Sequence, residues 1–328
     1  MNLIDVTKQF GTPEACNDFL ERMRWPEGVR CPKCDSDKVS KYVKQGSVRK
    51  SGPRAGEPVP ARILYVCLVC KKQFSVTEAT IFNDTHLSLE KWFVATALMV
   101  NAKKGLSALQ LKRDLKVAYK TAWYLNHRIR EAMALYEQAT IEPLTGTLEA
   151  DETYMGGKYD ERRKRARYDK EPVFGIVERG GKAHTFHVAH LNQQMVVRKL
   201  TDHIAINADA LYTDDSKLYD KMPGNVAKHD TVNHSAKEWV RGDVHTGTID
   251  GYWGLLKRGI ISSFHQVSIK HLHRYLSEFQ FRWNNREAAN IFVLVVAALV
   301  IGTALPYKEL IVSVDEPAKG TAPEDEPL

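Results

Sequence analysis

Three aspartates, Asp151, Asp214 and Asp250, lie where carboxylates could hold metal ions. Asp151 lies in the strand-like stretch TLEADETYM, Asp214 lies near the end of a second such stretch, ADALYTDDS, and Asp250 lies near the start of a helical stretch, TIDGYWGLLKRG. Carboxylates that converge from two adjacent strand ends and a helix could hold two Mg²⁺ or Mn²⁺ ions about 4 Å apart, as in-line phosphoryl displacement requires. The sequence therefore offers a candidate site for phosphoryl transfer.

Each of these acids has a plainer interpretation. A single aspartate more often caps an element or faces solvent than it catalyses, and Glu149, Glu152 and Asp215 are neighbours that could be the ligands instead. The helical stretch around Asp250 nevertheless has two distinct faces. Its expected buried face holds Ile249, Trp253 and Leu256, and the face of Asp250 holds Gly254 and Lys257. We expect Lys257 to meet a phosphate of the substrate.

Two C-x-x-C pairs, CPKC and CLVC, form a second candidate site. Their thiolates would complete a tetrahedral site for one structural Zn²⁺ ion, with the ligands Cys31, Cys34, Cys67 and Cys70. The long interval between the pairs predicts a hairpin with an extended loop, KQGSVRKSGPRAGEPVP, followed by the strand ARILYVC. A redox dithiol or unrelated free thiols are the alternatives. The fifth cysteine, Cys16, is expected to be a buried hydrophobic residue.

Residues 86–140 show helical periodicity in three segments. After a helix over 89–102, Ser107 can cap a second, ALQLKRDL, and a third runs YKTAWYLNHRIREAMALYEQA. A short helix, a tight turn and a longer basic helix predict a helix-turn-helix whose last helix lies in the major groove of DNA. The residues expected near DNA on this helix are Tyr119, Lys120, Tyr124, His127, Arg128 and Arg130. A plain helical bundle with a charged outer face is the alternative.

From Thr145 the pattern becomes strand-like. Three strands, TLEADETYM, PVFGIVER and KAHTFHVAHL, are followed by the helical stretch MVVRKLTDHI, the strand ADALYTDDS and a possible fifth strand, KHDTVNH. This order predicts an α/β fold, a mixed sheet with helices on its faces. The loop GGKYDERRKRARYDKE after the first strand is expected to contact DNA phosphates. The contacts would come from Arg162, Arg163, Lys164 and Arg165.

Composition and charge narrow the class of protein further. The chain has 328 residues, 43% of them hydrophobic, and a formal net charge of +7, which excludes collagen, a coiled coil and wholesale disorder. The basic balance favours a polyanionic partner such as nucleic acid. The N-terminal stretch lacks a secretory pattern and the apolar run 291–305 is shorter than a membrane span, so we expect a buried helix there and a cytoplasmic protein without a membrane segment.

Several long motifs follow the cysteine pairs in order: KTAWYLNHRIREAM, EADETYMGGK, VFGIVER, LYTDDS, VHTGTIDGYWGLLKRGI and HLHRYLSEFQFRWNNR. From Cys31 to about Arg286 the chain resembles the bacterial insertion-sequence transposases with an N-terminal zinc ribbon and an RNase H-like DDE domain. With the segments above, this resemblance predicts a zinc ribbon over 1–82, a helix-turn-helix over 86–140, the DDE domain over 145–312 and a disordered acidic tail over 313–328.

The resemblance implies a DNA transposase that binds the terminal inverted repeats of its element as a homo-oligomer and uses two Mg²⁺ ions for cleavage and strand transfer. It places the family's acidic triad on Asp151, Asp214 and Asp250, where the third acid is usually Glu in a motif like HTNTIEG and here the motif is HTGTIDG. A DNA-binding relic that no longer cleaves, or a nuclease of the same fold without strand transfer, are the alternatives. Arg282 and Arg286 either face the active site or pair with acids.

Overall fold

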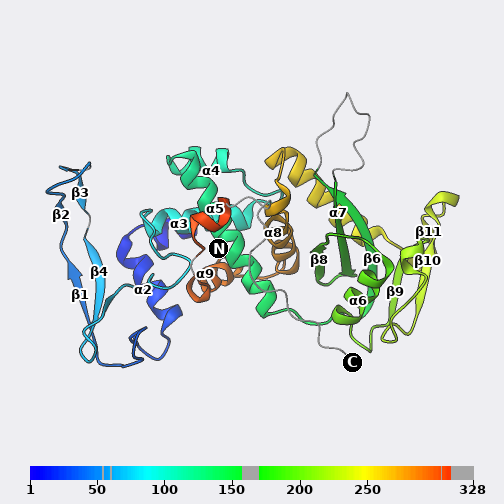
Figure 1. Cartoon of the computed structure of the whole chain (residues 1–328), viewed down its shortest axis with the longest axis horizontal. Coiled ribbons are helices and arrows are strands. Elements are labelled where there is room, and N and C mark those ends of the chain that lie inside the picture. Colours follow the sequence, from blue (N-terminus) through cyan, green and yellow to red (C-terminus); the bar gives the residue numbers. More distant parts are fainter. Residues whose placement is uncertain (54, 60, 157–169, 304, 312–328) are drawn as a thin grey trace, which may run out of the picture.

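A computed structural model describes residues 1–53, 55–59, 61–156, 170–303 and 305–311. Figure 1 shows an elongated molecule with a β-hairpin at one end, a group of helices in the middle and a β-sheet at the other end. The helical middle combines segments from the first and the last parts of the sequence, so the chain passes through it twice.

Two short helices that the sequence patterns did not predict begin the chain, α1 (Leu3–Gln9) and α2 (Pro13–Arg24). Both have local start signals. Asn2 and Asp5 form a capping box at α1, and Thr12 caps α2 directly before a proline at its first position. Their buried sides join the helical core, in which the predicted burial of Cys16 is confirmed.

The cysteine-bearing region forms the projecting hairpin. Strand β1 (Val39–Lys44) pairs antiparallel with β4 (Arg62–Cys67), which also pairs with β5 (Gln73–Phe74). Within the predicted loop, β2 (Ser47–Val48) pairs with β3 (Pro58–Val59) and lengthens the hairpin. Both cysteine pairs lie at its base, where the hairpin meets the helices.

The three helices predicted over residues 86–140 are present as α3 (Leu89–Asn101), α4 (Ala108–Leu115) and α5 (Tyr119–Ala139). The Ser107 hydroxyl accepts the N–H of Gln110 at 3.1 Å and begins α4, as expected. A left-handed Lys116, with φ of 52°, ends α4 and makes the tight turn into α5.

A five-stranded mixed sheet forms the other end of the molecule, in the spatial order β10-β9-β6-β7-β8. Strands β6, β7 and β8 are antiparallel neighbours, whereas β9 runs parallel to both β6 and β10. The predicted meander, crossover helix and return strands are therefore present. Their bounds are β6 Thr147–Met155, β7 Glu171–Glu178, β8 Ala183–His187, α6 Gln193–His203, β9 Ala210–Asp214 and β10 His229–Val232.

Alternation along β6 gives the sheet two different faces. Leu148 and Ala150 belong to a core that α6 covers through Val196 and Leu200. The opposite face is covered by α7 (Gly247–Gly259) and α8 (Leu272–Asn284). Around them lie the 3₁₀ turns Lys217–Tyr219, His234–Ala236 and Ile269–His271. The strands of a short hairpin are β11 (Val240–Arg241) and β12 (Val244–His245), and a π-helical turn, Ile260–Phe264, follows α7.

The apolar helix α9 (Ile291–Ile301) packs in the helical middle rather than on the sheet. It contacts α2, α3 and α5, and its Phe292 ring stacks on Phe10 with centroids 5.8 Å apart. A helix that is apolar on every side is stable where several elements pack around it, and α2, α3 and α5 do so here. The zinc-ribbon residues, helices α3–α5 and α9 therefore share one hydrophobic core, whereas α7 and α8 pack in a second core on the sheet. A last short helix, α10 (Tyr307–Ile311), follows.

The predicted absence of a membrane segment concerns α9 above all, because it holds the longest apolar run. No helix in the described ranges is both long and apolar enough to cross a membrane. The acidic segment 313–328 lies outside the described residues.

Candidate functional site

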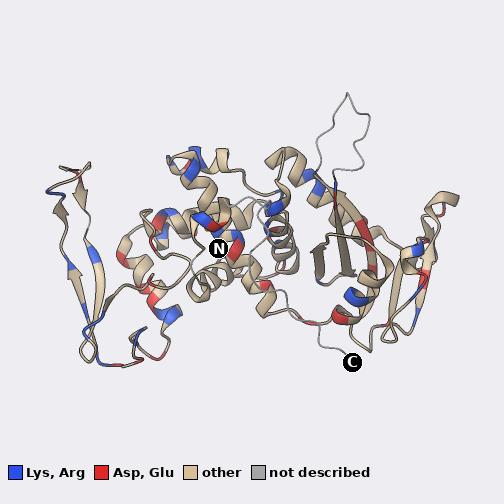
Figure 2. Ribbon diagram, viewed as in Figure 1, with Lys and Arg blue, Asp and Glu red and all other residues tan. Residues whose placement is uncertain are grey.

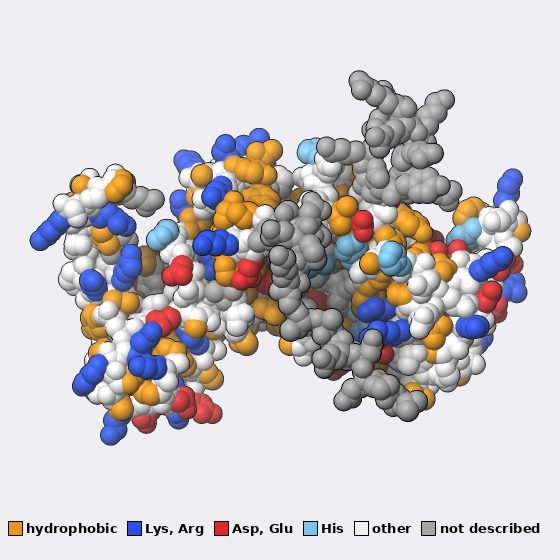
Figure 3. Space-filling model, in the orientation of Figure 1, with side chains coloured by type: hydrophobic (Ala, Val, Ile, Leu, Met, Phe, Trp, Pro, Cys, Tyr) orange, Lys and Arg blue, Asp and Glu red, His pale blue; other side chains and the backbone are white. Residues whose placement is uncertain are grey.

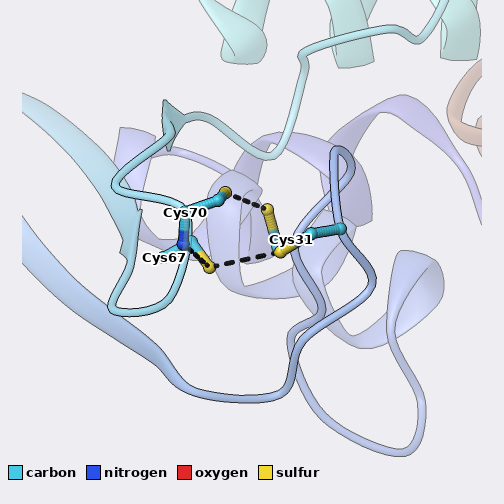
Figure 4. Close-up of side chains that lie close together, drawn as sticks. Cys31, Cys67 and Cys70 are labelled. Atoms are coloured by element: carbon cyan, nitrogen blue, oxygen red, sulfur yellow. Dashed lines mark hydrogen bonds between the residues drawn. The ribbon is translucent and has the colours of Figure 1, made fainter.

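The four predicted zinc ligands come together at the base of the hairpin. Their Sγ atoms all lie within 4.8 Å of one another, with 3.6 Å between Cys31 and Cys70 and between Cys34 and Cys67. Figure 4 shows the sulfurs of Cys31, Cys67 and Cys70 facing one another. Four sulfurs about 2.3 Å from one tetrahedral ion lie roughly 3.8 Å apart, so this cluster has the size and chemistry of a structural zinc site.

The two cysteine turns have the same backbone conformation. Asp35 and Lys71, which directly follow the second cysteine of each pair, are left-handed with φ of 55° and 59°. Their N–H groups donate to the carbonyl oxygens of Cys31 and Cys67 at 2.9 and 3.0 Å. A backbone N–H also donates to the Cys67 sulfur at 3.5 Å and lowers the pKa of that thiol. The pKa of Cys31 is also lowered, whereas hydrogen bonds to the other cysteine sulfurs raise that of Cys34. Cys31 and Cys67 are therefore the thiols that most favour the thiolate form, the form that binds zinc.

Asp151 and Asp214 lie side by side on the sheet, at the point where β9 ends. In the parallel pairing of β6 and β9, Glu149 lies opposite Tyr212. Asp151 and Asp214 each follow two residues later, so the same register places them opposite each other. Both side chains therefore lie on the face covered by α7. Asp214 ends its strand as predicted, whereas β6 continues past Asp151 to Met155.

Helix α7 brings Asp250 to the same face from its first turn. The helix packs on the sheet through Trp253, whose indole Nε1 donates to Asp151 Oδ2 at 3.0 Å. The ring lies over Gly175, the partner of Asp151 on β7, and a Cβ at this position would be 2.6 Å from it. The predicted buried face is confirmed, since Ile249 and Trp253 are 0% and 3% exposed.

The electrostatics of this site favour a bound cation. Burial, followed by the charges of Glu152, Asp214 and Asp250, raises the pKa of Asp151 to about 7. Burial also raises the pKa of Asp214, whose Oδ1 is buried and has no hydrogen-bond partner among the described residues. Carboxylates that are desolvated and repel one another suit a hard divalent cation. Among the described residues, the four cysteines are the one group of three or more potential ligands whose ligand atoms all lie close together.

The three neighbouring acids have other partners. Glu152 lies on the opposite face of β6 and accepts the hydroxyl of Tyr219 at 2.8 Å. Asp215 accepts an N–H of the Asn233 amide at 2.9 Å. Glu149 accepts the backbone N–H groups that begin α7. Of the candidates left open by the sequence, Asp151 and Asp214 are therefore the acids of these strands that remain available to a metal ion.

Most of the predicted recognition helix α5 lies inside the protein. His127, Arg128 and Arg130 are 0%, 3% and 1% exposed. Arg130 Nε lies 2.5 Å from Glu278 of α8, and Arg128 donates to the carbonyl of Asn83 at 2.8 Å. The expectation that these three residues contact DNA is therefore corrected, because protein groups surround them on every side.

The first turn of α5 is open to solvent. Tyr119 and Lys120 are exposed, and the Lys120 Nζ lies 4.2 Å from the centroid of the Tyr307 ring. Tyr124, one turn later, is half-buried and donates its hydroxyl to the carbonyl of Leu305. Of the predicted contacts on α5, Tyr119 and Lys120 are thus the ones most accessible to DNA.

The other predicted DNA contacts, and the two arginines whose role the sequence left open, lie in three different settings. Lys257 is exposed on α7, on the helix face that also carries Asp250. The basic loop residues Arg162, Arg163, Lys164 and Arg165 lie outside the described residues. Arg282 pairs with the buried Glu278, and Arg286 donates to the Gly180 and Gly181 carbonyls at 2.9 Å, so both are structural in this conformation.

Two family matches coincide with the two candidate sites. Residues 11–73 match the transposase zinc-ribbon domain, and residues 143–284 match the ISXO2-like transposase domain. A Halobacterium salinarum protein described as an uncharacterized protein in transposable element ISH50 is 30% identical over 292 residues, which cover 84% of this chain and 92% of that protein. The predicted α/β fold class, a mixed sheet with flanking helices preceded by a zinc ribbon, is confirmed.

Two solved assemblies contain similar chains. The intasome of simian T-cell lymphotropic virus in complex with the PP2A regulatory subunit B56 gamma gives 14% identity and a TM-score of 0.27, over 57% of this chain and 62% of that one. The Mos1 transposase paired-end complex with the left transposon end gives 10% identity and a TM-score of 0.25, over 63% and 78%. Scores this low carry no argument about the fold or the chemistry.

Proposed function

Because the chain belongs to the IS1595 family of insertion-sequence transposases, we propose that it binds the terminal inverted repeats of its element and catalyses phosphodiester cleavage and strand transfer. One observation carries the catalytic part of this proposal. Asp151 and Asp214 lie at equivalent positions of two parallel strands, on the face where α7 presents Asp250. Burial and the neighbouring acids, including Asp214 and Asp250, raise the pKa of Asp151, and a buried acid shifted in this way is typical of functional sites.

The proposed reaction has two steps. In cleavage, a water oxygen bonds to phosphorus and a 3′ hydroxyl leaves. In strand transfer, that 3′ oxygen bonds to a target phosphorus and displaces the 3′ oxygen of the target strand. Bound Mg²⁺ or Mn²⁺ would activate the attacking oxygen and stabilise charge on the leaving oxygen. Asp151, Asp214 and Asp250 would hold the ions, and Trp253 orients Asp151 through its hydrogen bond.

The DNA surface that we propose consists of exposed basic side chains on three elements. Figure 2 marks Lys and Arg positions in blue along the ribbon of the hairpin and of α4, and Figure 3 shows basic side chains on the same parts of the surface. Exposed examples on β1, β4 and α4 are Lys41, Lys44, Arg62, Lys112 and Arg113. Lys120 on α5 and Lys257 on α7 extend this surface towards the catalytic face. Side chains of this type contact phosphates and make binding depend on salt concentration.

Other parts of the proposal concern assembly. One structural Zn²⁺ ion would hold the hairpin against the helices through the four cysteines. A homo-oligomer would bring the two ends of an element together before strand transfer. Such a protein would act on DNA in the cytoplasm.

The test is a cleavage and strand-transfer assay with labelled duplexes from the flanks of the gene, in Mg²⁺ or Mn²⁺. We expect nicking at a defined end in the wild-type chain and its loss in Asp214→Asn. The matched control is Asp215→Asn, which removes the neighbouring exposed acid and is expected to retain cleavage. If both variants cleave like the wild type, the catalytic assignment fails.

Replacing Asp250 by Glu separates the alternative functions. The Asp side chain is one methylene shorter than Glu, and sub-ångström placement of a ligand matters to the reaction rate. Specific end binding without cleavage, followed by a gain of cleavage in Asp250→Glu, would identify a DNA-binding relic. Cleavage without transfer of the 3′ end to target DNA would identify a nuclease of the same fold.

A further inference from the structure

Glu149 is a fully buried carboxylate that joins β6 to the start of α7. Its Oε2 accepts the backbone N–H groups of Thr248 and Ile249 at 2.7 and 2.9 Å, and its Oε1 accepts the Thr248 hydroxyl at 2.9 Å. The first N–H groups of a helix have no partner within the helix. The local N-cap residue, Thr246, makes no side-chain capping bond. A residue about one hundred positions earlier therefore caps this helix.

The charge of Glu149 is balanced within the same group of residues. Arg179, at the end of β7, donates its Nε to Glu149 Oε1 at 2.7 Å. The same guanidinium donates to the carbonyl of His245, the last residue of β12 and two residues before α7, at 3.0 Å. The positive end of the helix dipole also favours a carboxylate here. Glu149 and Arg179 thus connect β6, β7 and the segment that leads into α7.

These hydrogen bonds connect β6 and α7, the two elements that carry the proposed metal ligands Asp151 and Asp250. Asp151 follows Glu149 by two residues on the same face of β6, and Asp250 directly follows Ile249 in α7. We propose that Glu149 is a positioning residue, which fixes Asp250 relative to Asp151 so that both carboxylates reach one metal site. This inference rests on the proposed function, because it concerns the same three aspartates. It assigns Glu149 no contact with DNA or metal.

The test measures metal binding by the zinc-loaded full chain without requiring cleavage. Tb³⁺ is the probe, because Trp253 lies against Asp151 and can sensitise the luminescence of a bound lanthanide. We expect Glu149→Gln to weaken the apparent Tb³⁺ affinity by about 10- to 100-fold, the usual effect of removing a group that orients metal ligands. Mn²⁺ competition should show the same loss.

The matched control is Glu137→Gln. Glu137 is also a buried carboxylate, and it accepts amide N–H groups from Gln280, Asn284 and Asn285 rather than backbone N–H groups of α7. We expect this variant to lose thermal stability while Tb³⁺ affinity stays at the wild-type value. A purely structural role for Glu149 would give the same result as this control.

Two further measurements keep the inference testable if Glu149→Gln does not fold. Thr248→Ala removes only the hydroxyl donor, so we expect a smaller loss of affinity, which Thr248→Ser restores. In a double-mutant cycle, Asp250→Asn should cost less affinity in the Thr248→Ala chain than in the wild type, because Thr248 and Glu149 act through Asp250. Unchanged affinity in folded Glu149 and Thr248 variants, or full additivity, overturns the inference.

Failure of the proposed function gives a different result. If Asp214→Asn leaves the Tb³⁺ signal of the wild-type chain unchanged, the aspartates hold no metal, and both proposals fall. If the signal depends on Asp214 and yet survives both Glu149→Gln and Thr248→Ala, the positioning role alone falls.

Discussion

Burial changes the acid–base properties of individual side chains in this protein. Asp151 is an ordinary acid in the sequence, but burial and the surrounding acids raise its pKa to about 7. The cysteines and aspartates could be selected as candidate metal ligands from residue types and their order, because thiolates and carboxylates are characteristic metal ligands. The partners Trp253 and Glu149 could not be predicted, because their bonds cross about one hundred residues of sequence. The glycine within VFGIVER was the one available signal, since glycine inside a strand often marks a close approach.

We expect Asp151→Asn to stabilise the metal-free chain above neutral pH. Between pH 4 and 7 the folded Asp151 keeps a proton that the unfolded chain releases, so its ionisation lowers stability as pH rises through this window. The amide removes this penalty, and we expect a gain of the order of 2 kcal/mol at pH 7.5 and less at pH 5. Urea unfolding at both pH values measures it, and an equal effect at both would contradict the electrostatic explanation. Added Mn²⁺ should stabilise only the wild type.

His127 should make the protein sensitive to acid. Burial and the charge of Arg130 lower the pKa of His127 far below its usual value, and its ring lies between Trp123 and His271. Below about pH 6.5 the unfolded chain binds a proton that the folded chain excludes, so stability falls as pH falls. We expect His127→Phe to flatten this slope between pH 7 and 5 in urea unfolding. Zinc loss affects both chains and cancels in the comparison.

At the scale of elements, local periodicity predicted much of the fold. The strand TLEADETYM coincides with β6, and the predicted third helix coincides with α5. These patterns are local, so the sequence carries them. The prediction that the charged residues of α5 are exposed was wrong for Arg130, because this residue lies in a pattern that is typical of an exposed basic face. Its partner, Glu278, lies far away in the chain and becomes apparent only from packing.

The packing of α7 on the sheet should depend on Gly175. A Cβ there would be 2.6 Å from the Trp253 ring, so Gly175→Ala must displace the indole or the helix. Overpacking of this kind costs about 1–3 kcal/mol. We expect this loss in urea unfolding, together with weaker Mn²⁺ binding because Trp253 no longer orients Asp151. Gly251→Ala is the control, since no atom lies within 4 Å of a Cβ at that glycine. Equal behaviour of the two variants would exclude this role.

The zinc ribbon should depend on its metal. We expect one zinc ion per chain by atomic emission, and its loss in Cys34→Ser. Because the hairpin joins the helical core at the cysteine turns, chelation should lower the melting temperature and make the hairpin susceptible to protease. Cys16→Ser tests the fifth cysteine, which lies outside the cluster, and should retain the zinc. A full zinc content in Cys34→Ser would exclude a four-cysteine site.

For the whole molecule, a polar contact between α5 and α8 joins the helical middle to the sheet unit. Arg130 and Arg282 pair with Glu278, which is fully buried. Nearby, Glu137 accepts amide N–H groups from α8. Because these groups are buried and paired, the two parts of the molecule should hold one fixed orientation. That orientation sets the position of the hairpin relative to the face that carries Asp151, Asp214 and Asp250.

Breaking this contact should cost more than breaking an exposed one between the same helices. Glu278→Gln leaves two buried guanidinium groups without a counter-charge, so we expect a loss of about 3–5 kcal/mol. The control is Glu131→Gln, which breaks the partly exposed pair with Arg274 and should cost at most about 1 kcal/mol. Chemical unfolding of both variants measures the difference. Similar losses would indicate that Glu278 does not hold the two parts together.

The position of α9 has a consequence for synthesis of the protein. The hydrophobic core around the first helices includes residues from the end of the described chain, among them Phe292 and Leu299. Domains usually fold on the ribosome from the N-terminus onwards. Here the core of the first helices lacks the side chains of α9 until that helix has left the ribosome. Fragments that stop before Ile291 would therefore lack a complete helical core, and if the proposed end binding is correct, they would not compete with full chains for DNA.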